Sequence, residues 1–241
     1  MTSRHPRQRL ISLHSVLGAS AATVAMVVVG TQAAFAQTPA DAAAACAKLA
    51  TLSNFPVAAT QITLAKFNAR GSTSASAVAL PDHCQTRGNS AQIAACYAAG
   101  ALPNHCQVQG IINKRVGVDG YPYGDSFEVR LPAPADWNGR FMLQGGGGTE
   151  GAVPPAVGIA GTLTPSLARG WAVASQDGGH ENKDLPKPTQ FFLDPEAIVD
   201  HAYRSIDVTT QTAKHLVDTF YGRKANRSYF VGCSTGGRQA W

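Results

Sequence analysis

A glycine–serine–glycine pattern near the end of the chain holds residues that could do chemistry. Gly232-Cys233-Ser234-Thr235-Gly236 matches G-x-S-x-G, a turn that presents a nucleophilic serine to carbonyl carbon. Where this turn is used, an acid and then a histidine follow the serine in chain order. Only Thr235 to Trp241 follow it here, and none of them is acidic or a histidine. The sequence therefore predicts the front half of a serine hydrolase, ending just after its nucleophile.

The residues around Ser234 predict how this serine is held. Ser228 to Val231 is a short, apolar, β-prone run, which predicts a buried strand. Gly237 to Trp241 would open a helix, so Ser234 would occupy a sharp, strained turn between strand and helix. Glycine is needed at 232 and 236 because side chains there would collide. The helix N-terminus would favour a developing oxyanion; the alternative is a surface Gly/Ser turn.

A second glycine-rich segment, Gln144 to Gly151, follows a predicted strand at Phe141–Leu143. Such a loop gives one of the two N–H groups that bind an oxyanion, and the residue after the nucleophile, Thr235, gives the other. One alternative is a flexible loop. Another is a dinucleotide site, because the segment also fits G-x-G-x-x-G at Gly146, Gly148 and Gly151. That fingerprint must open a helix, which Pro154-Pro155 disfavours, and export of the protein also argues against a dinucleotide.

Other titratable residues are less suited to catalysis. Asp177 and His180 follow a predicted strand at Trp171–Ala174, but His180 precedes Ser234, which is the wrong order for this kind of triad. We expect Asp177 and His180 to hold the backbone of their own loop. His201 and His215 lie on a predicted helix, where a solvated or helix-face role is favoured. No pair of histidines or cysteines has convincing zinc spacing.

The N-terminus predicts export. Residues 1–36 have a basic start, a largely apolar stretch and an A-x-A site at Ala34-Phe35-Ala36, which together indicate a signal peptide; a membrane anchor is the alternative. Three of the 20 basic residues and none of the 15 acidic ones lie in this segment. The remainder is nearly balanced in charge, so the alkaline pI gives no reason to expect nucleic-acid binding. We expect a secreted or periplasmic protein without a membrane anchor.

Five cysteines are an odd number for an oxidising compartment. Cys46, Cys84, Cys96 and Cys106 allow three pairings among themselves. Cys233 is left over beside the predicted nucleophile. A partner beyond residue 241 would account for both the odd cysteine and the missing acid and histidine.

The chain changes character near residue 110. Residues 37–109 are predicted to be an irregular, disulfide-linked segment with a helix from Asp41 to Leu52, a loop at 71–79, and a short duplication in which residues 79–85 recur as 101–107. Residues 110–241 alternate strands and helices, which predicts an α/β fold with a central sheet. Phe127, Val129 and Leu131 alternate with polar residues and predict a half-buried strand.

The longest predicted helix lies between Asp194 and Gly222. Asp194 would cap its start, Pro195 suits the first turn, and Gly222 suits the C-terminal cap. Its apolar spacing of three and four residues predicts one buried stripe, made of Ile198, Ala202, Ile206, Thr209, Ala213, Leu216 and Phe220.

Several of these motifs, in register, resemble the tannase and feruloyl esterase family of secreted α/β hydrolases. The resemblance covers about Leu102 to Trp241, through 101–106, 114–123, 137–141, 145–151, 177–180, 220–223 and 228–234. It implies that Ser234 is the nucleophile and that Thr235 and Gly148 give the oxyanion N–H groups. It also implies the disulfide Cys46–Cys106, and a bond from Cys233 to a cysteine beyond residue 241 that adjoins the catalytic histidine. Cys84 and Cys96 are then left to pair with each other, outside the family's pattern.

The resemblance also sets expectations for the intact protein. The catalytic acid, the histidine and a large substrate-binding lid with a structural calcium would all lie beyond residue 241, and no cofactor or metal is expected in this chain. The duplication at 79–107 departs from the family's pattern, and its effect is open.

We thus predict an incomplete α/β-hydrolase fold from a secreted serine carboxylic ester hydrolase of small aromatic (phenolic or terephthalate-type) acid esters, nearly inactive as 241 residues. A non-catalytic ligand-binding domain and an oxidoreductase that uses the glycine loop are the alternatives. The oligomeric state stays open.

Overall fold

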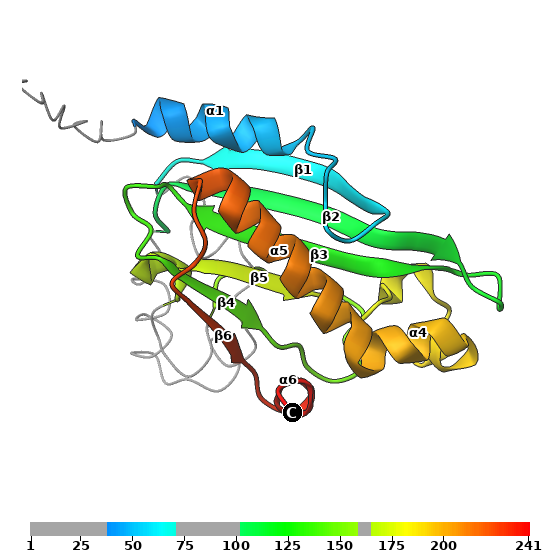
Figure 1. Ribbon diagram of the computed structural model, residues 1–241. Coiled ribbons are helices and arrows are strands. Elements are labelled where there is room, and N and C mark those ends of the chain that lie inside the picture. The colour runs from blue at the N-terminus through cyan, green and yellow to red at the C-terminus, as the bar shows by residue number, and fades with distance from the viewer. Residues whose placement is uncertain (1–37, 71–101, 159–164) are drawn as a thin grey trace, which may run out of the picture. The chain divides into compact units, whose positions relative to one another are not determined.

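The described residues of the computed structural model, 38–70, 102–158 and 165–241, fold around one mixed sheet (Figure 1). In this part of the chain the strand order is β1-β2-β3-β5-β4-β6. The strands are β1 Thr60–Asn68, β2 His105–Val116, β3 Pro122–Pro132, β4 Arg140–Gln144, β5 Ala172–Gln176 and β6 Arg227–Val231. The first four in that order pair antiparallel, whereas β4 runs parallel to both β5 and β6. The carboxyl ends of β4, β5 and β6 therefore meet at the same edge of the sheet.

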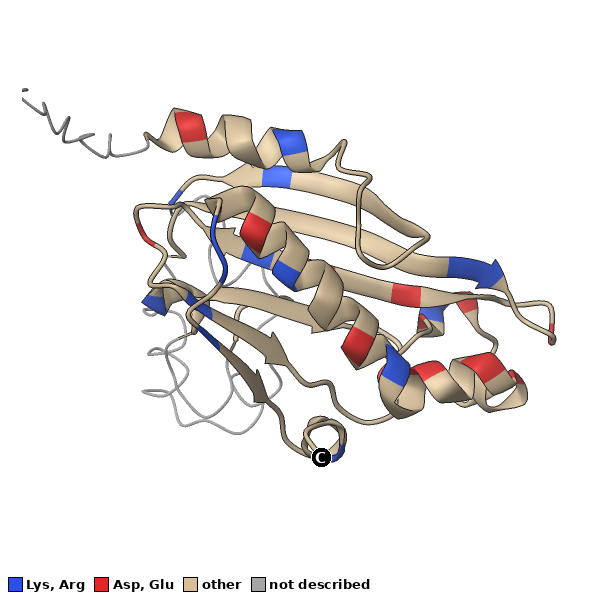
Figure 2. Ribbon diagram, viewed as in Figure 1, with Lys and Arg blue, Asp and Glu red and all other residues tan. Residues whose placement is uncertain are grey.

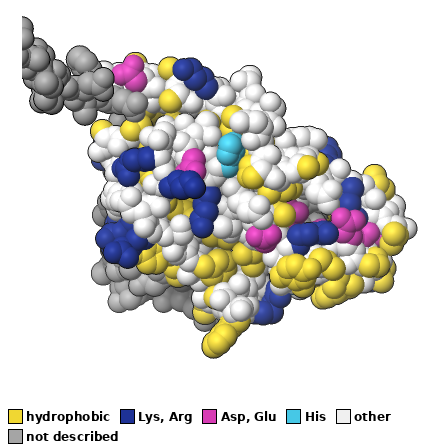
Figure 3. Space-filling view, viewed as in Figure 1, with side chains coloured by type: hydrophobic (Ala, Val, Ile, Leu, Met, Phe, Trp, Pro, Cys, Tyr) yellow, Lys and Arg dark blue, Asp and Glu magenta, His cyan; other side chains and the backbone are white. Residues whose placement is uncertain are grey.

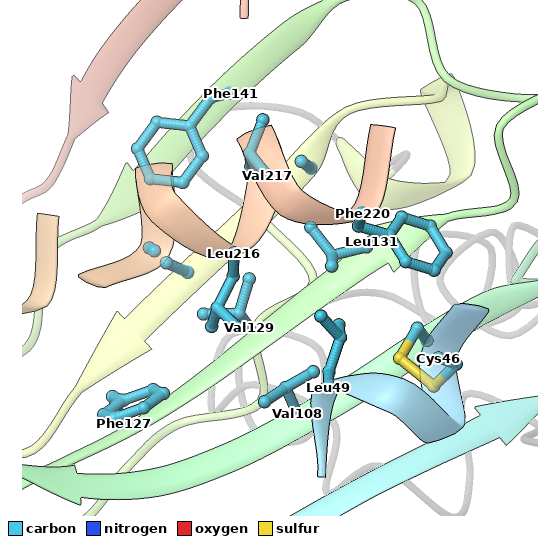
Figure 4. Packing of buried hydrophobic residues seen from close by; sticks show 14 of the residues in the cluster. Cys46, Leu49, Val108, Phe127, Val129, Leu131, Phe141, Leu216, Val217 and Phe220 are labelled. Carbon is cyan, nitrogen blue, oxygen red and sulfur yellow. A yellow bond between two sulfur atoms is a disulfide. The ribbon is translucent and has the colours of Figure 1, made fainter. Parts of the chain in front are cut away.

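Helices α1 (Pro39–Leu49) and α5 (Ser205–Tyr221) pack on the sheet and contact each other. A capping box between Thr38 and Asp41 starts α1. The main core lies where the two helices meet β2 and β3, with Leu49, Val108, Val129, Leu131 and Leu216 fully buried (Figure 4). Charged residues of both signs are interspersed along α5 (Figure 2), as expected for a helix with one solvated face.

The sequence places both ends of the long helical segment correctly, but the segment is interrupted. Asp194 caps α4 (Pro195–Val199) by accepting a hydrogen bond from the Ala197 amide at 2.7 Å, and Gly222 ends α5 with φ 66°. A π-helix at Asp200–Arg204 joins α4 to α5. The α4 region continues from a 3₁₀ turn at Gln190–Leu193.

The π-helix explains why the predicted buried stripe is wrong at its start. A π turn inserts an extra residue into a helix, so the face that points to the core shifts by one position. Ala197 is buried in place of Ile198, which is 39% exposed, and Ala202 is exposed as well. From Thr209 to Phe220 the stripe is buried as predicted. Exposed apolar side chains, among them Phe192, Leu193 and Ile198, belong to this region, and Figure 3 shows hydrophobic surface there.

Asp194 also fixes the far end of β2. Arg115 donates to both of its carboxylate oxygens, at 2.7 and 3.1 Å, and the Val118 amide donates at 2.9 Å. Burial opposes ionisation, but the Arg115 hydrogen bonds and the two backbone amides outweigh it and lower the pKa of Asp194 to about 2.

Strand β3 is buried on both faces, so the prediction of a half-buried strand is wrong. Its polar residues face a second layer instead of solvent. Glu128 pairs with Arg130 at 2.6 Å and accepts the Ala156 amide at 3.0 Å, which fixes the segment that follows the glycine loop. Because the two charged residues pair with each other, the sequence of β3 alternates between apolar and polar residues like that of a half-exposed strand, although both faces are buried.

Strand β6 is exposed at its first three residues and half-buried at the last two, so the predicted burial of Ser228–Val231 is wrong. It pairs with β4 and has no second neighbour in the described sheet. An apolar run at a sheet edge has the same composition as a central strand, and only the topology separates them.

Residues 37–109 are more regular than predicted where they are described. Helix α1 and the nine-residue β1 join the same sheet, and β2 runs across the boundary expected at residue 110. The predicted Cys46–Cys106 disulfide is present (Figure 4) and ties α1 to β2. The predicted Cys84–Cys96 disulfide, the loop at 71–79, most of the duplication and the signal peptide lie outside the described residues. None of the helices that the structure describes is long and apolar enough to cross a membrane.

Candidate active site

Ser234 lies where β6 gives way to helix α6 (Thr235–Gln239), as the sequence predicts (Figure 1). Its backbone has φ 56° and ψ −122°, a conformation that costs a residue with a Cβ about 1–3 kcal/mol. The two motif glycines touch across this turn: a Cβ at position 232 would lie 2.5 Å from the carbonyl carbon of Gly236. The turn is therefore strained and closed by glycine contact, and its serine is exposed.

The glycine loop after β4 packs directly on this turn. The Gly145 amide donates to the Val231 carbonyl at 2.8 Å, which extends the β4–β6 pairing into the loop. The Gly236 amide donates to the Gly146 carbonyl at 3.0 Å. A Cβ at position 145 would lie 2.6 Å from the Gly236 Cα, so the two backbones can approach this closely only without side chains.

The structure brings Thr235 and Gly148 together, the two residues predicted to give N–H groups. The Thr235 hydroxyl donates to the Gly148 carbonyl at 2.5 Å. Gly148 has φ 58° and nothing stands within 4 Å of where its Cβ would be. Within the described ranges, neither backbone amide donates to a protein acceptor. Two N–H groups beside a strained, exposed serine can bind a negatively charged oxygen formed from a carbonyl.

Arg238 anchors α6 on its other side. Its guanidinium donates to the carbonyls of His201 and Ala202 at 3.0 and 3.1 Å. These carbonyls belong to the π-helix at Asp200–Arg204. The interruption of the long helix thus provides a docking point for the nucleophile helix. His201 itself is half-buried beside Arg238. Burial is the main cause that lowers the pKa of His201, and the positive charge of Arg238 lowers it further.

Asp177 and His180 hold their own loop, as expected. Asp177 accepts hydrogen bonds from the amides of Gly179 at 2.9 Å and Ser126 at 3.2 Å. Both side chains are fully buried. Burial raises the pKa of Asp177 well above its usual value and lowers that of His180 to about 4. His215, on α5, packs edge-on against Phe55.

The dinucleotide interpretation of the glycine loop is wrong, because the loop does not open into a helix: the described residues that directly follow Gly151 are irregular. The residues from Ala152 to Gly158 are irregular, and the Gln144 side chain fixes them by bonding Pro155 and Gly158 at 3.0 and 2.8 Å. Among the described residues, no three His, Cys, Asp or Glu side chains are grouped so that they could hold a metal ion. Cys233 is exposed and forms no disulfide with another cysteine in the described part of the chain.

No role is predicted from the sequence for Glu150, Gln176, Gln239 or Arg238, although all four contact the turn, the loop or their supports. The hydrogen bonds from Gln176 to Glu150, from Arg238 to Ala202 and from Gln239 to Glu150 join residues 26, 36 and 89 positions apart. No local pattern encodes such pairs. The only sequence signal is a polar side chain in or beside a predicted motif.

Comparisons with known proteins agree with this geometry. Residues 106–241 match the family described as tannase and feruloyl esterase. The chain is 47% identical over 192 residues to mono(2-hydroxyethyl) terephthalate hydrolase of Piscinibacter sakaiensis, covering 77% of this chain and 28% of that protein. It is 32% identical over 114 residues to a probable feruloyl esterase B-2 of Aspergillus flavus, covering 47% of this chain and 20% of that protein.

Solved structures show the same fold at lower identity. Feruloyl esterase B from Aspergillus oryzae superposes with a TM-score of 0.59 at 22% identity, over 83% of this chain and 34% of that one. Tannin acyl hydrolase from Aspergillus niger gives a TM-score of 0.51 at 22% identity, over 84% and 34%. The chain thus spans about a third or less of the proteins it matches. On the family match and the 47% identity, the chain belongs to the tannase and feruloyl esterase family.

Proposed function

We propose that this chain carries the nucleophile and the oxyanion-binding groups of a secreted serine carboxylic ester hydrolase. The observation that carries the proposal is the backbone of Ser234, held at φ 56° and ψ −122° between β6 and α6. Strain of this kind persists only where the surroundings enforce it, and it is a feature of functional turns. The glycine loop supports the assignment because its backbone contacts the turn directly.

The proposed reaction follows from these groups. The Ser234 hydroxyl oxygen bonds to the ester carbonyl carbon while its proton passes to a histidine. The carbonyl oxygen becomes an oxyanion and accepts hydrogen bonds from the Thr235 and Gly148 amides. The alcohol leaves with the proton from the histidine, and water then attacks the acyl-enzyme to release the acid and restore Ser234. Loss of one oxyanion donor costs about 2.7–4 kcal/mol in comparable hydrolases.

We propose esters of aromatic acids as the substrate class. The names of the similar proteins point this way, because terephthalate and ferulate are both aromatic carboxylates. The resemblance assigns substrate selection to a lid beyond residue 241, so the acid cleaved is not specified by the described residues. The calcium implied by the resemblance belongs to the same lid, and no step of the reaction is assigned to it.

The histidine, the acid and a partner for Cys233 are also expected beyond residue 241. Without a general base, the rate of acylation falls by several orders of magnitude. The 241 residues alone should therefore show almost no turnover. Export follows from the predicted signal peptide and is consistent with the Cys46–Cys106 disulfide.

The test compares the 241-residue chain with the protein expressed from its complete reading frame. Both are assayed on methyl ferulate, mono(2-hydroxyethyl) terephthalate and p-nitrophenyl butyrate, with Ser234→Ala as the control, and both are treated with a fluorophosphonate probe. We expect turnover and labelling of Ser234 only in the complete protein, and neither in the variant. Substantial and equal turnover by the complete wild type and its Ser234→Ala variant, or a probe adduct on another residue, would refute the proposal. If both complete proteins show only background rates, the proposal also fails and a non-catalytic binding domain is favoured.

A further inference from the structure

Glu150 closes the glycine loop and is held in place by its own backbone. It has φ 60°, rare for a residue with a Cβ, and its amide donates to the Gly147 carbonyl at 2.9 Å. Its carbonyl accepts from the Asn182 side chain at 3.0 Å. The side chain turns back beneath the loop, where a Cβ at Gly146 would overlap its carboxylate. Its position is thus set before any contact of the carboxylate is considered.

The carboxylate of Glu150 joins β5 to the nucleophile helix. Gln176, the last residue of β5, donates its Nε2 to one oxygen at 2.7 Å. Gln239, in the last turn of α6, donates its Nε2 to the other oxygen. One partly buried carboxylate therefore contacts the sheet and the helix that starts at Thr235.

Both glutamines are oriented by other bonds, so each presents a donor to Glu150. The Gln176 Oε1 accepts from the Ser205 hydroxyl at 2.8 Å and from the Gly178 amide. The Gln239 Oε1 accepts from the Gly146 amide at 3.2 Å. Position 150 must consequently supply two acceptors, which a carboxylate does and a side-chain amide does not.

We infer that Glu150 is a positioning residue for the proposed ester hydrolysis: its carboxylate holds the glycine loop that carries Gly148 against the helix that carries Thr235. The inference rests on the proposed function for its catalytic consequence, but not for its structural one. Gln239 is the other half of the contact, since it bonds Glu150 and the Gly146 amide with the same side-chain amide.

The surroundings of Glu150 oppose its negative charge. Burial raises its pKa to about 7, and hydrogen bonds from Gln176 and Gln239 and the charge of Arg238 only partly offset this. His201 approaches the same region, because a Cβ at Gly178 would lie 3.1 Å from its Nδ1 and 3.2 Å from the Glu150 Cβ. A glutamine at position 150 would avoid the cost of burying a charge. It would, however, turn its own N–H donor toward the N–H donor of Gln176 or Gln239.

The decisive experiment exchanges the acid and the amide. Glu150→Gln places two donors face to face, and Gln239→Glu places two carboxylates face to face. The double variant Glu150→Gln/Gln239→Glu restores every hydrogen bond of the network with the roles of the two positions reversed. Asp207→Asn is a matched control, because Asp207 also accepts from a glutamine amide, that of Gln211 at 3.0 Å, but on the exposed face of α5.

Two readouts separate this inference from the proposed function. Hydrogen–deuterium exchange of the Gly146 amide and of α6 needs no catalysis and is measured on the 241-residue chain and the complete protein. We expect about tenfold faster exchange in each single variant, wild-type rates in the double variant, and no change in Asp207→Asn. In the complete protein, kcat should fall about tenfold in the single variants with KM unchanged, and recover in the double variant.

Wild-type exchange in both single variants, or no recovery of exchange in the double variant, would overturn the inference. If exchange follows the expected pattern but wild-type protein has no Ser234-dependent turnover, Glu150 still positions the loop and the proposed function has failed. If exchange follows the pattern while kcat does not change, Glu150 has a structural role only and the positioning role is refuted.

Discussion

Replacing Ser234 by glycine should stabilise the protein while removing its proposed nucleophile. At φ 56° and ψ −122° a residue with a Cβ is strained by about 1–3 kcal/mol, whereas glycine is not. Glycine also loses more conformational entropy on folding, which costs about 0.5–1 kcal/mol. Taken at the middle of each range, the difference leaves Ser234→Gly more stable than Ser234→Ala by about 1 kcal/mol. Ser234→Ala is the correct reference, because it removes the hydroxyl but keeps the Cβ.

The assay is urea unfolding followed by circular dichroism on the 241-residue chain. A gain of this size corresponds to about 2–4 °C in Tm for a chain of this length, so thermal unfolding is an independent check. Ser228 provides a matched pair, because it is an exposed serine in β6 with ordinary strand geometry. There, Ser228→Gly should be less stable than Ser228→Ala by about 0.5–1 kcal/mol.

Opposite signs at the two positions isolate the strain at 234 from the general effect of glycine on the unfolded chain. If Ser234→Gly is no more stable than Ser234→Ala, the turn stores no strain. The surrounding structure would then not hold the nucleophile in an unfavourable conformation.

Three further changes test the supports of the site. Cys46→Ser/Cys106→Ser should lower the free energy of unfolding by about 4 kcal/mol, since the bridge spans a sequence separation of 60; an unchanged urea midpoint would contradict this. Asp194 has a pKa of about 2, below its unfolded value of 3.8, so its ionised form stabilises the fold above pH 4 and that contribution is lost as the pH falls toward 2. Asp194→Asn should therefore lose about 2 kcal/mol at pH 7 and almost nothing at pH 2, and a pH-independent difference between the unfolding curves would refute the assignment. Gly232→Ala should destabilise by about 1–3 kcal/mol, because its Cβ would lie 2.5 Å from backbone. Gly147→Ala is the control and should stay within about 0.5 kcal/mol of wild type, because no atom lies within 4 Å of where its Cβ would be. If calorimetry finds Gly232→Ala as stable as Gly147→Ala, the expected clash at position 232 does not exist.

Features governed by neighbours in sequence could be predicted. Three such features are the turn at Ser234, the cap at Asp194 and the left-handed Gly222. Each depends only on residues within a few positions, so the local sequence is enough to predict it. The existence of the glycine loop was equally visible, since a strand followed by four glycines has few structural uses.

Features governed by topology could not. The composition of β6 is that of a buried strand, but among the described strands it pairs with β4 alone, and the elements that would cover it are not specified by its own residues. Apolar and polar residues alternate along β3, but the polar ones are buried and pair with each other, as Glu128 and Arg130 do, instead of facing solvent. The helical stripe failed at Ile198 because one π turn changes the phase, and no residue type in Asp200–Arg204 demands that turn.

One glycine of each motif, Gly145 and Gly236, is required for the same physical reason. Considered in sequence, Gly232 and Gly236 belong to the serine turn, and Gly145 and Gly146 to a separate loop 86 or more positions earlier. In space, a Cβ at Gly236 would lie 2.9 Å from the Gly146 carbonyl and 3.0 Å from the Gly145 Cα, and a Cβ at Gly145 would meet Gly236 in return. Gly145 and Gly236 each lack a side chain because the other motif occupies the space, whereas a Cβ at Gly232 would meet Gly236 and one at Gly146 would meet the Glu150 carboxylate. The oxyanion-binding groups are thus placed by backbone contact between the motifs, and this is why a single polar side chain, Glu150, is well situated to fix their separation.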